Sequence, residues 1–312
     1  MMRYVGKRVL QAVLVLWGLI TVIFFVLHLI PGDPVRAVLG GRASDATVQQ
    51  VREQLGLDRP LPEQYLRFLT DIVQGNLGTS LALNDQVSHV LGQRLLPSIL
   101  LIAYGMFFAV LIGVPLGIQA ALRPNRAADH IIRLQTTFLF GMPTFWLALV
   151  LALLFGLVLG WFPVSGYQTG LGGILRSLTL PALTLGLSLV VIVTRTLRSN
   201  LIEVLKSEYI EAARSRGLSE RRVIVKHALR NAAMPTLTIL STIIGYLIGS
   251  TVVLEQVFRI PGAGSLLVQS ILRHDYQTVR AVALLSGLVV IAAGLSADLL
   301  QAILDPRVRL AR

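Results

Sequence analysis

The residues whose types and spacing could do chemistry are gathered in one charged segment, 211–235, which reads EAARSRGLSERRVIVKHALRNAAMP. Good helix formers and charged side chains precede Gly217, which suits the left-handed backbone position that ends a helix. Leu218 can make the apolar contact that follows such an end, and Ser219 can cap a second helix. The segment therefore predicts a helix–glycine–helix elbow. Its paired small residues favour a close protein–protein contact over a basic loop resting on lipid headgroups.

Motifs for catalysis are missing from the sequence. The only Gly-Lys pair, Gly6-Lys7, is followed by Arg8, so the phosphate-binding loop G-x-x-x-x-G-K-[ST] does not occur. The chain also has no cysteine, no H-E-x-x-H and no pair of intramembrane aspartates. We therefore expect no catalytic residues, no metal site and no cofactor in this chain, and no ATP hydrolysis by it.

Composition sets the class of protein. The chain has 312 residues, of which 54% are hydrophobic and 14% charged, and its mean hydropathy is +0.72. These values predict an all-α polytopic membrane protein rather than a soluble domain. Basic residues before the first apolar run admit a signal peptide, but the run is too long and lacks a small-residue cleavage site, which favours a retained helix. Six transmembrane helices are expected, at 9–30, 98–122, 134–160, 178–197, 235–254 and 281–304.

The distribution of basic residues predicts the orientation. With both termini in the cytoplasm, the inner segments hold 18 of the 28 lysines and arginines, as the positive-inside rule requires. The net charge of +12 then lies on the inner face, which accounts for the pI of 10.9 without any nucleic-acid partner. Segment 31–96 is placed outside and 195–233 inside. A probe at Ser80 should therefore be reachable from outside, and one at Ser215 should not.

The outer segment 31–96 is expected to contain short amphipathic helices. Ser44 can cap the first, which Gly56 would end, and Pro62 can open a second, closed by Gly75. A third is expected to begin near residue 87. These helices are too few for a large independent domain. Two interpretations stay open: a lid over the span ends, or a docking surface or gate.

Several spans carry small residues at helix-packing spacing. Such G-x-x-x-G pairs favour close helix approach over ligand contact. They are Gly113 and Gly117, Gly156 and Gly160, and Gly245 and Gly249.

Polar residues inside the spans are few. The fifth span has a small, hydroxylated face that could line a translocation pathway, although packing alone could explain it. Asp298 is the one acid well inside a span, and its place near the inner end favours a solvated helix end over a functional carboxylate. His28 lies at a boundary and is interpreted as structural. The candidate pathway residues are Ser241, Tyr246, Gly249 and Ser250.

The charged segment resembles a known family. EAARSRG at 211–217 and RNAAMP at 230–235 are similar to the EAA loop of binding-protein-dependent ABC importer permeases. The family loop commonly ends I-x-L-P, whereas this chain has Ala233-Met234-Pro235. The resemblance implies that the loop couples the permease to an ATPase through Glu211, Ala212, Ala213, Gly217, Arg230 and Asn231.

Segments elsewhere narrow the resemblance to the first permease subunit of dipeptide and oligopeptide importers. They are RYVGKRVLQAVLVLWGLITVIFFVLHLIPGDP at 3–34, LGLDRPLPEQY at 55–65, GNLGTSL at 75–81, EQVFRIPGAGSLLVQSILRHDYQTV at 255–279 and LDPRVR at 304–309. The resemblance covers essentially the whole chain. It implies a type I ABC importer permease fold divided into 1–30, an extracytoplasmic insert 31–96, a transmembrane domain 97–304 with the coupling loop 199–234, and a tail 305–312.

The resemblance also implies partners and a mechanism. These are a second homologous permease subunit forming a heterodimer, two ATP-binding subunits that hold ATP and Mg, an extracytoplasmic solute-binding protein, a peptide substrate and a prokaryotic cytoplasmic (inner) membrane. Transport would proceed by alternating access. Permeases for nickel, glutathione or another small solute share this plan. An ion-coupled secondary transporter would need buried ionisable groups at the midplane, and a scaffold without transport would leave the polar face of the fifth span unexplained.

Overall fold

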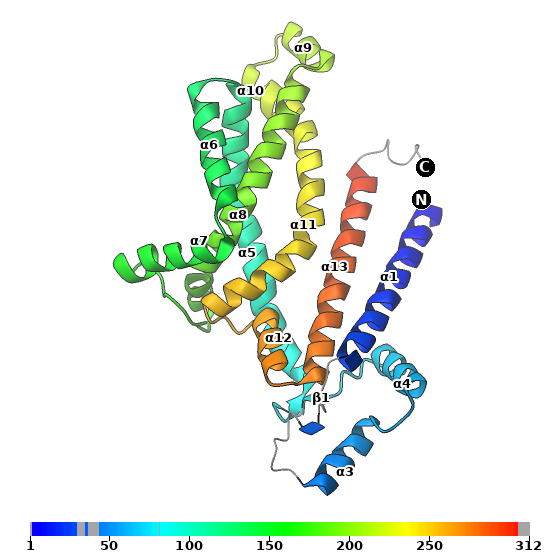
Figure 1. The fold of residues 1–312 in the computed structure, drawn as a ribbon. Helices are drawn as coiled ribbons and strands as arrows, with labels where there is room; N and C mark the ends of the chain where they lie inside the picture. The colour runs from blue at the N-terminus through cyan, green and yellow to red at the C-terminus, as the bar shows by residue number, and fades with distance from the viewer. Residues whose placement is uncertain (1, 30–34, 37–43, 81, 305–312) are drawn as a thin grey trace. The chain divides into compact units, whose positions relative to one another are not determined.

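The computed structural model describes the backbone of residues 2–29, 35–36, 44–80 and 82–304, and this part of the chain is almost entirely helical (Figure 1). The chain divides into two compact units, residues 1–98 with 261–295, and residues 99–260 with 296–312. Asp298 belongs to a helix, but its side chain lies outside the described residues.

The first unit is built on two long helices, α1 (Met2–Leu29) and α13 (Tyr276–Leu304). They approach closely where Gly287 of α13 faces Leu19 of α1, since a Cβ at Gly287 would collide with that leucine side chain. The aromatic ring of Phe24 is 2% exposed and packs with Phe68 and Leu284. This cluster joins α1 and α13 to α4 (Leu61–Val73).

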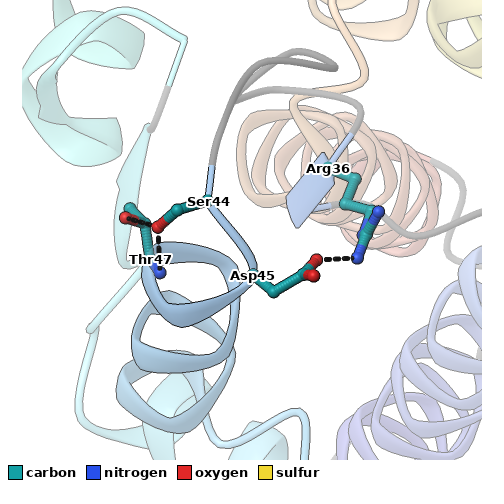
Figure 2. Close-up of polar contacts among 4 residues, drawn as sticks. All are labelled: Arg36, Ser44, Asp45 and Thr47. Atoms are coloured by element: carbon teal, nitrogen blue, oxygen red, sulfur yellow. Dashed lines mark hydrogen bonds and ion pairs between the residues drawn. The ribbon is translucent and has the colours of Figure 1, made fainter.

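The helix α3 (Asp45–Leu55) begins as the sequence predicts. Ser44 accepts a hydrogen bond from the backbone N–H of Thr47 at 3.1 Å, and Asp45 in the first turn pairs with Arg36 (Figure 2). Gly56 ends the helix in the left-handed region, with φ of +66°. The predicted cap and stop are both confirmed.

Of the other two helices predicted for segment 31–96, one is present and the other is part of a longer helix. The second forms α4, with Pro62 in its first turn and Gly75 at φ +72° just beyond its end. The third is not a separate helix: residue 87 begins α5 (Val87–Leu122), which continues without a break through the second predicted span. Its 36 residues make a helix about 54 Å long, more than a bilayer core of about 30 Å requires. Pro97 separates the predicted third helix from the predicted span in the sequence, but α5 continues through it.

A small hairpin is fastened to the start of α13. β1 (Thr79–Ser80) pairs antiparallel with β2 (Asp85–Gln86). The Ser80 hydroxyl donates to the carboxylate of Asp275, which also accepts from the Thr278 hydroxyl at 2.7 Å. Ser80 is 1% exposed, so the expectation that it is reachable from outside is wrong. Apolar side chains of the short helix α12 (Ala263–Leu272), α5 and α13 pack beside the hairpin.

The second unit is organised around α8 (Leu171–Leu205), the most deeply buried of the candidate spans. Glycines let α5 approach it. A Cβ at Gly113 would lie 2.9 Å from Val193, and one at Gly117 would lie 3.2 Å from Leu197. The hydroxyl of Thr194 on α8 donates to the Gly113 carbonyl at 3.2 Å. The packing interpretation of Gly113 and Gly117 is confirmed.

The third predicted span is broken rather than continuous. It consists of α6 (Ala127–Gly141), then α7 (Thr144–Leu151) and the π-helix η1 (Ala152–Val158), with a bend of 104° between the two parts. Pro143 explains the break, because it offers no N–H and holds Met142 in an extended conformation. Within the described ranges, five helices are long and apolar enough to cross a membrane, or six if this bent pair is one span.

The glycine pair predicted for that span does not pack against another helix. Gly160 lies beyond the end of η1 at φ +65°, and Gly156 faces Val164 of the following loop. The G-x-x-x-G spacing assumed an uninterrupted helix, and this segment is not one.

The fifth span is longer than predicted. The helix α10 (Glu220–Arg222), the π-helix η2 (Val223–Ala228) and α11 (Leu229–Val257) form one continuous element of 38 residues. Pro235 lies inside α11 instead of marking the start of the span. The charged second arm of the elbow and the apolar span are therefore one helix.

Candidate functional site

The elbow predicted around Gly217 is present. The helix α9 (Glu208–Ser215) ends with two hydrogen bonds, from Gly217 N–H to the Arg214 carbonyl at 2.9 Å and from Leu218 N–H to the Ala213 carbonyl at 3.4 Å. This is the Schellman arrangement, and Gly217 takes the left-handed conformation that it needs, with φ of +76°. Ser219 follows with extended backbone as the N-cap of α10. The chain thus reverses at one glycine, as its sequence indicates.

Polar contacts tie the two arms of the elbow together. Arg214 on the first arm makes two hydrogen bonds to the Glu220 carboxylate on the second, at 2.8 and 3.3 Å. Farther along, the Asn231 amide donates to the Tyr209 hydroxyl at 2.8 Å. These pairs are exposed, so each contributes little energy, but together they restrict the angle between the arms.

An apolar cluster fixes the elbow to the ends of the long helices. Ile210 of α9 and Val223 of η2 are fully buried, and they pack with Leu197 and Leu201 of α8. Ala121, at the end of α5, belongs to the same cluster. The elbow is therefore packed directly against the ends of α8 and α5.

The predicted coupling residues divide between two faces of α9. Glu211 and Ala212 are exposed, whereas Ala213 is 9% exposed and belongs to the apolar cluster. Consecutive helix positions lie about 100° apart, so both alanines cannot face one partner. Arg230 and Asn231 are exposed on the second arm. We name the exposed residues Glu211, Ala212, Ser215, Arg216 and Gly217 the elbow surface.

A buried ion pair near the elbow was not predicted. Arg198 of α8 holds Asp129 of α6 with two hydrogen bonds of 2.6 Å, and the Asn125 backbone N–H adds a third at 2.9 Å. The Asp129 side chain has no exposure, whereas that of Arg198 is 21% exposed. The sequence signal that could have indicated this pair is Asp129 itself, one acidic residue in a short and otherwise basic connection between two apolar runs.

The candidate pathway residues share one face of α11. Tyr246 is 67% exposed, Gly249 is exposed, and Ser241 and Ser250 are partly exposed. The opposite face is buried, through Leu240, Leu247 and Leu254. The hydroxyls of Ser241 and Ser250 donate to carbonyls one turn earlier in the same helix, at 2.9 and 3.1 Å. Their oxygens can still accept hydrogen bonds from a solute or a partner.

His28 has contacts typical of a structural residue. Its Nδ1 lies 2.7 Å from the Phe24 carbonyl in its own helix, and its Nε2 lies 3.1 Å from the Gln64 side-chain oxygen of α4. In the described part of the chain, no three His, Cys, Asp or Glu side chains are grouped closely enough to hold a metal ion.

Comparison with known proteins identifies the family. Residues 113–310 match the model of the binding-protein-dependent transport system inner membrane component, and residues 1–103 match the corresponding N-terminal model. The chain belongs to this family. It is therefore a permease subunit of an ABC importer, a multi-pass inner membrane protein with a role in transport rather than catalysis.

Relatives match the permease along nearly its whole length. It is 37% identical over 309 residues to the glutathione transport system permease protein GsiC of Pectobacterium atrosepticum, with 99% of each chain covered. It is 36% identical over 314 residues to the oligopeptide transport system permease protein AppB of Bacillus subtilis, again with 99% of each covered. These matches set aside the alternatives of an ion-coupled secondary transporter and a scaffold without transport.

A solved structure supports the fold of the permease. A chain of the MetNI methionine ABC transporter, in an inward-facing conformation, aligns with a TM-score of 0.58 at 16% identity. The alignment covers 69% of this permease and 96% of that chain. The predicted type I ABC importer fold is confirmed.

Proposed function

We propose that this permease subunit moves short peptides across the inner membrane by alternating access, driven by ATP hydrolysis in separate subunits. The observation that carries the mechanism is the single 38-residue helix from Glu220 to Val257, which joins the second arm of the elbow to the fifth span. No flexible linker separates the elbow from the span, so a displacement of the elbow is not absorbed between them. It therefore moves the span itself.

The elbow surface is the part of the chain suited to dock an ATPase subunit. Its small exposed residues, Ala212 and Gly217, allow close approach, while Glu211 and Arg216 offer charges to a complementary groove. On the second arm, Asn231 holds α9 through its hydrogen bond to Tyr209, and Arg230 is exposed beside it. In this proposal, ATP and Mg are bound by the two partner ATPases.

The remaining partners follow from the same arrangement. The exposed face of α11 suits a second, homologous permease subunit, with a solute pathway between the two chains. The distribution of basic residues supports an orientation with both termini and the elbow inside and the insert 31–96 outside, where a solute-binding protein can deliver the solute. The regions 1–30, 31–96, 97–304 and 305–312 are proposed as the functional divisions, with the coupling loop at 199–234.

The relatives support short peptides as the substrate class. One is named for glutathione and another for oligopeptides, and glutathione is itself a tripeptide derivative. The two names thus agree on a small solute with amide bonds and free carboxylates. Glutathione itself is the second candidate, and nickel has no comparable support.

Reconstitution of the complete importer tests this function. The permease is assembled with its partner permease, its ATPase subunits and its solute-binding protein in proteoliposomes, and uptake of labelled di-, tri- and pentapeptides is measured. Uptake should require both internal ATP and the binding protein, and an excess of unlabelled peptide should compete. Glutathione is tested as a competitor in parallel. Uptake of nickel but of no peptide would contradict the proposed substrate class.

A further inference from the structure

A polar pocket of about 470 Å³ lies within the first unit, away from the residues assigned to coupling and to the pathway. Its wall is formed by α4, by the turn before the hairpin and by the first turns of α13. The rings of Phe24 and Phe68 form an apolar part of the wall. The volume lies in the range of sites that bind small molecules.

Two guanidinium groups line this pocket. Arg280 comes from α13 and Arg67 from α4. The Arg280 guanidinium carbon lies 4.7 Å from the centre of the Phe68 ring, and one of its N–H groups donates to the Gln277 side-chain oxygen. The group is therefore held in a defined orientation by a ring at its face and an amide at its edge.

Neither guanidinium has a carboxylate at ion-pairing distance among the described residues. Asp71 also lines the pocket and lies four residues after Arg67 on α4, yet the two side chains form no ion pair. The Asp71 carboxylate instead accepts a long hydrogen bond of 3.4 Å from Asn76. Thus no ion pair joins Arg67 or Arg280 to Asp71, and N–H groups of both guanidiniums remain available to hydrogen-bond a ligand.

Amide side chains complete the polar wall. Gln64 donates to the Arg59 carbonyl at 2.7 Å, which fixes its amide and turns its oxygen toward His28. His28 lies between the Phe24 carbonyl and the Gln64 side-chain oxygen, on the side of the pocket formed by α1.

We propose that this pocket binds a small zwitterion of amino-acid or short-peptide size, with its carboxylate at Arg67 and Arg280 and its ammonium group at Asp71. The planar guanidinium fork matches a carboxylate in two parallel hydrogen bonds. Asp71, which also lines the pocket, supplies the complementary charge for the amine. The charges of the pocket carry this assignment, independently of the solute that passes through the membrane.

Calorimetric titration of the assembled importer with trialanine tests the site. Trialanine should bind wild type, whereas trialanine amide, which has no carboxylate, and N-acetyl-trialanine, which has no ammonium group, should bind at least tenfold more weakly. Arg67→Gln should weaken trialanine binding by about tenfold or more, the usual effect of losing a hydrogen bond to a charged group. Arg280→Lys keeps the charge and removes the fork, so it should weaken binding by less than Arg67→Gln.

Arg59→Gln is the matched control. Arg59 is an exposed arginine of the same unit that pairs with Glu63 and does not line the pocket. It should bind trialanine as wild type does. Thermal unfolding is measured for each variant. If Arg280→Lys is unstable, the result for Arg67→Gln tests the proposal. Arg67 is exposed, so its replacement removes no buried contact.

Equal trialanine binding by wild type, Arg67→Gln and Arg280→Lys would overturn the proposal. So would equal binding of trialanine and its amide. If trialanine does not bind but Arg67→Gln releases the solute-binding protein in a salt-dependent manner, the pocket serves an acidic side chain of that protein and the zwitterion site is wrong. Peptide uptake is followed on the same preparation, so a failure of the proposed function is recognised separately.

Discussion

Arg198 and Asp129 form a bidentate ion pair that fastens α6 to α8, with both donor–acceptor distances at 2.6 Å. The Asp129 carboxylate has no exposure and takes a third hydrogen bond from the Asn125 backbone. The carboxylate thus accepts three hydrogen bonds, two from Arg198 and one from the backbone. The pair lies in the unit that carries the elbow, and it holds α6 and α8 together.

Removing one partner of this pair should be costly. Asp129→Ala leaves the Arg198 guanidinium largely buried without its counter-charge, which should cost about 3–5 kcal/mol of stability. Thermal unfolding of the purified permease complex measures the loss. The double variant Asp129→Ala, Arg198→Met should be less destabilised than Asp129→Ala alone. Arg195→Gln, which loses an exposed hydrogen bond to Thr137 and a contact with the exposed Phe140 ring, is the control and should change stability little. An unchanged unfolding midpoint in Asp129→Ala would show that the pair is not stabilising.

Gly217 should tolerate substitution according to backbone conformation rather than size. No heavy atom lies within 4 Å of the position where a Cβ would stand, so the cost of a side chain is the positive φ of +76°. Gly217→Asn should retain most ATP-dependent uptake, because asparagine enters the left-handed region readily. Gly217→Val should strain the turn by roughly 1–3 kcal/mol and reduce uptake strongly.

Both Gly217 variants are compared in proteoliposomes at equal amounts of assembled complex, with ATPase association measured by co-purification. From the turn geometry we expect both uptake and ATPase association to decrease in the order wild type, Gly217→Asn, Gly217→Val. Equal uptake by all three would remove the Schellman turn from the coupling mechanism.

Cysteine labelling tests the orientation. The native chain has no cysteine, so single replacements give an unambiguous signal. Gln50 on α3 is exposed and replaces the buried Ser80 as the outer probe, while Ser215 on the elbow is the inner probe. An impermeant maleimide applied to intact cells should label Gln50→Cys and not Ser215→Cys. Permeabilised cells should show labelling at both. The opposite pattern in intact cells would reverse the orientation and make docking of a cytoplasmic ATPase at the elbow impossible.

Substitutions at two adjacent residues of α11 distinguish a face that lines a pathway from a face that packs against other helices. Ser250 lies on the partly exposed face, and Thr251 is 2% exposed on the packed side. Ser250→Leu should leave the yield of assembled complex unchanged and lower peptide uptake, because it narrows the proposed pathway. Thr251→Leu should lower the yield instead, since overpacking a filled contact costs about 1–3 kcal/mol. Loss of assembly in Ser250→Leu would assign that face to a helix contact with the partner permease.

The elbow could be predicted residue by residue because its signals are local. A glycine at a left-handed position and a leucine after it act within one turn of chain, and the structure has both in the expected place. The same holds for Ser44 and Gly56 around α3. Ser219 occupies the N-cap position of α10, but its side chain makes no capping hydrogen bond. The membrane class also followed from composition, since hydropathy is a sum over residues and needs no contacts.

Continuity of helices was harder to predict. Pro143 breaks its span with a 104° bend, whereas Pro235 stays inside a helix of 38 residues. Both prolines lack an N–H, so the difference depends on how neighbouring packing accommodates the missing bond. The sequence shows that a proline is present, but it does not show which side chains pack around that proline.

The sequence alone determined the class of protein, the elbow and the order of the spans, because these depend on residue type and short-range spacing. Only the tertiary structure decided that Ala213 faces inward while Ala212 faces outward, that Ser80 is buried on Asp275, and that Asp129 meets Arg198 across 69 residues. Burial and ion pairing depend on which helices meet. That choice is made by the packing of the whole unit, through contacts such as Gly113 on Val193, and no local pattern records it.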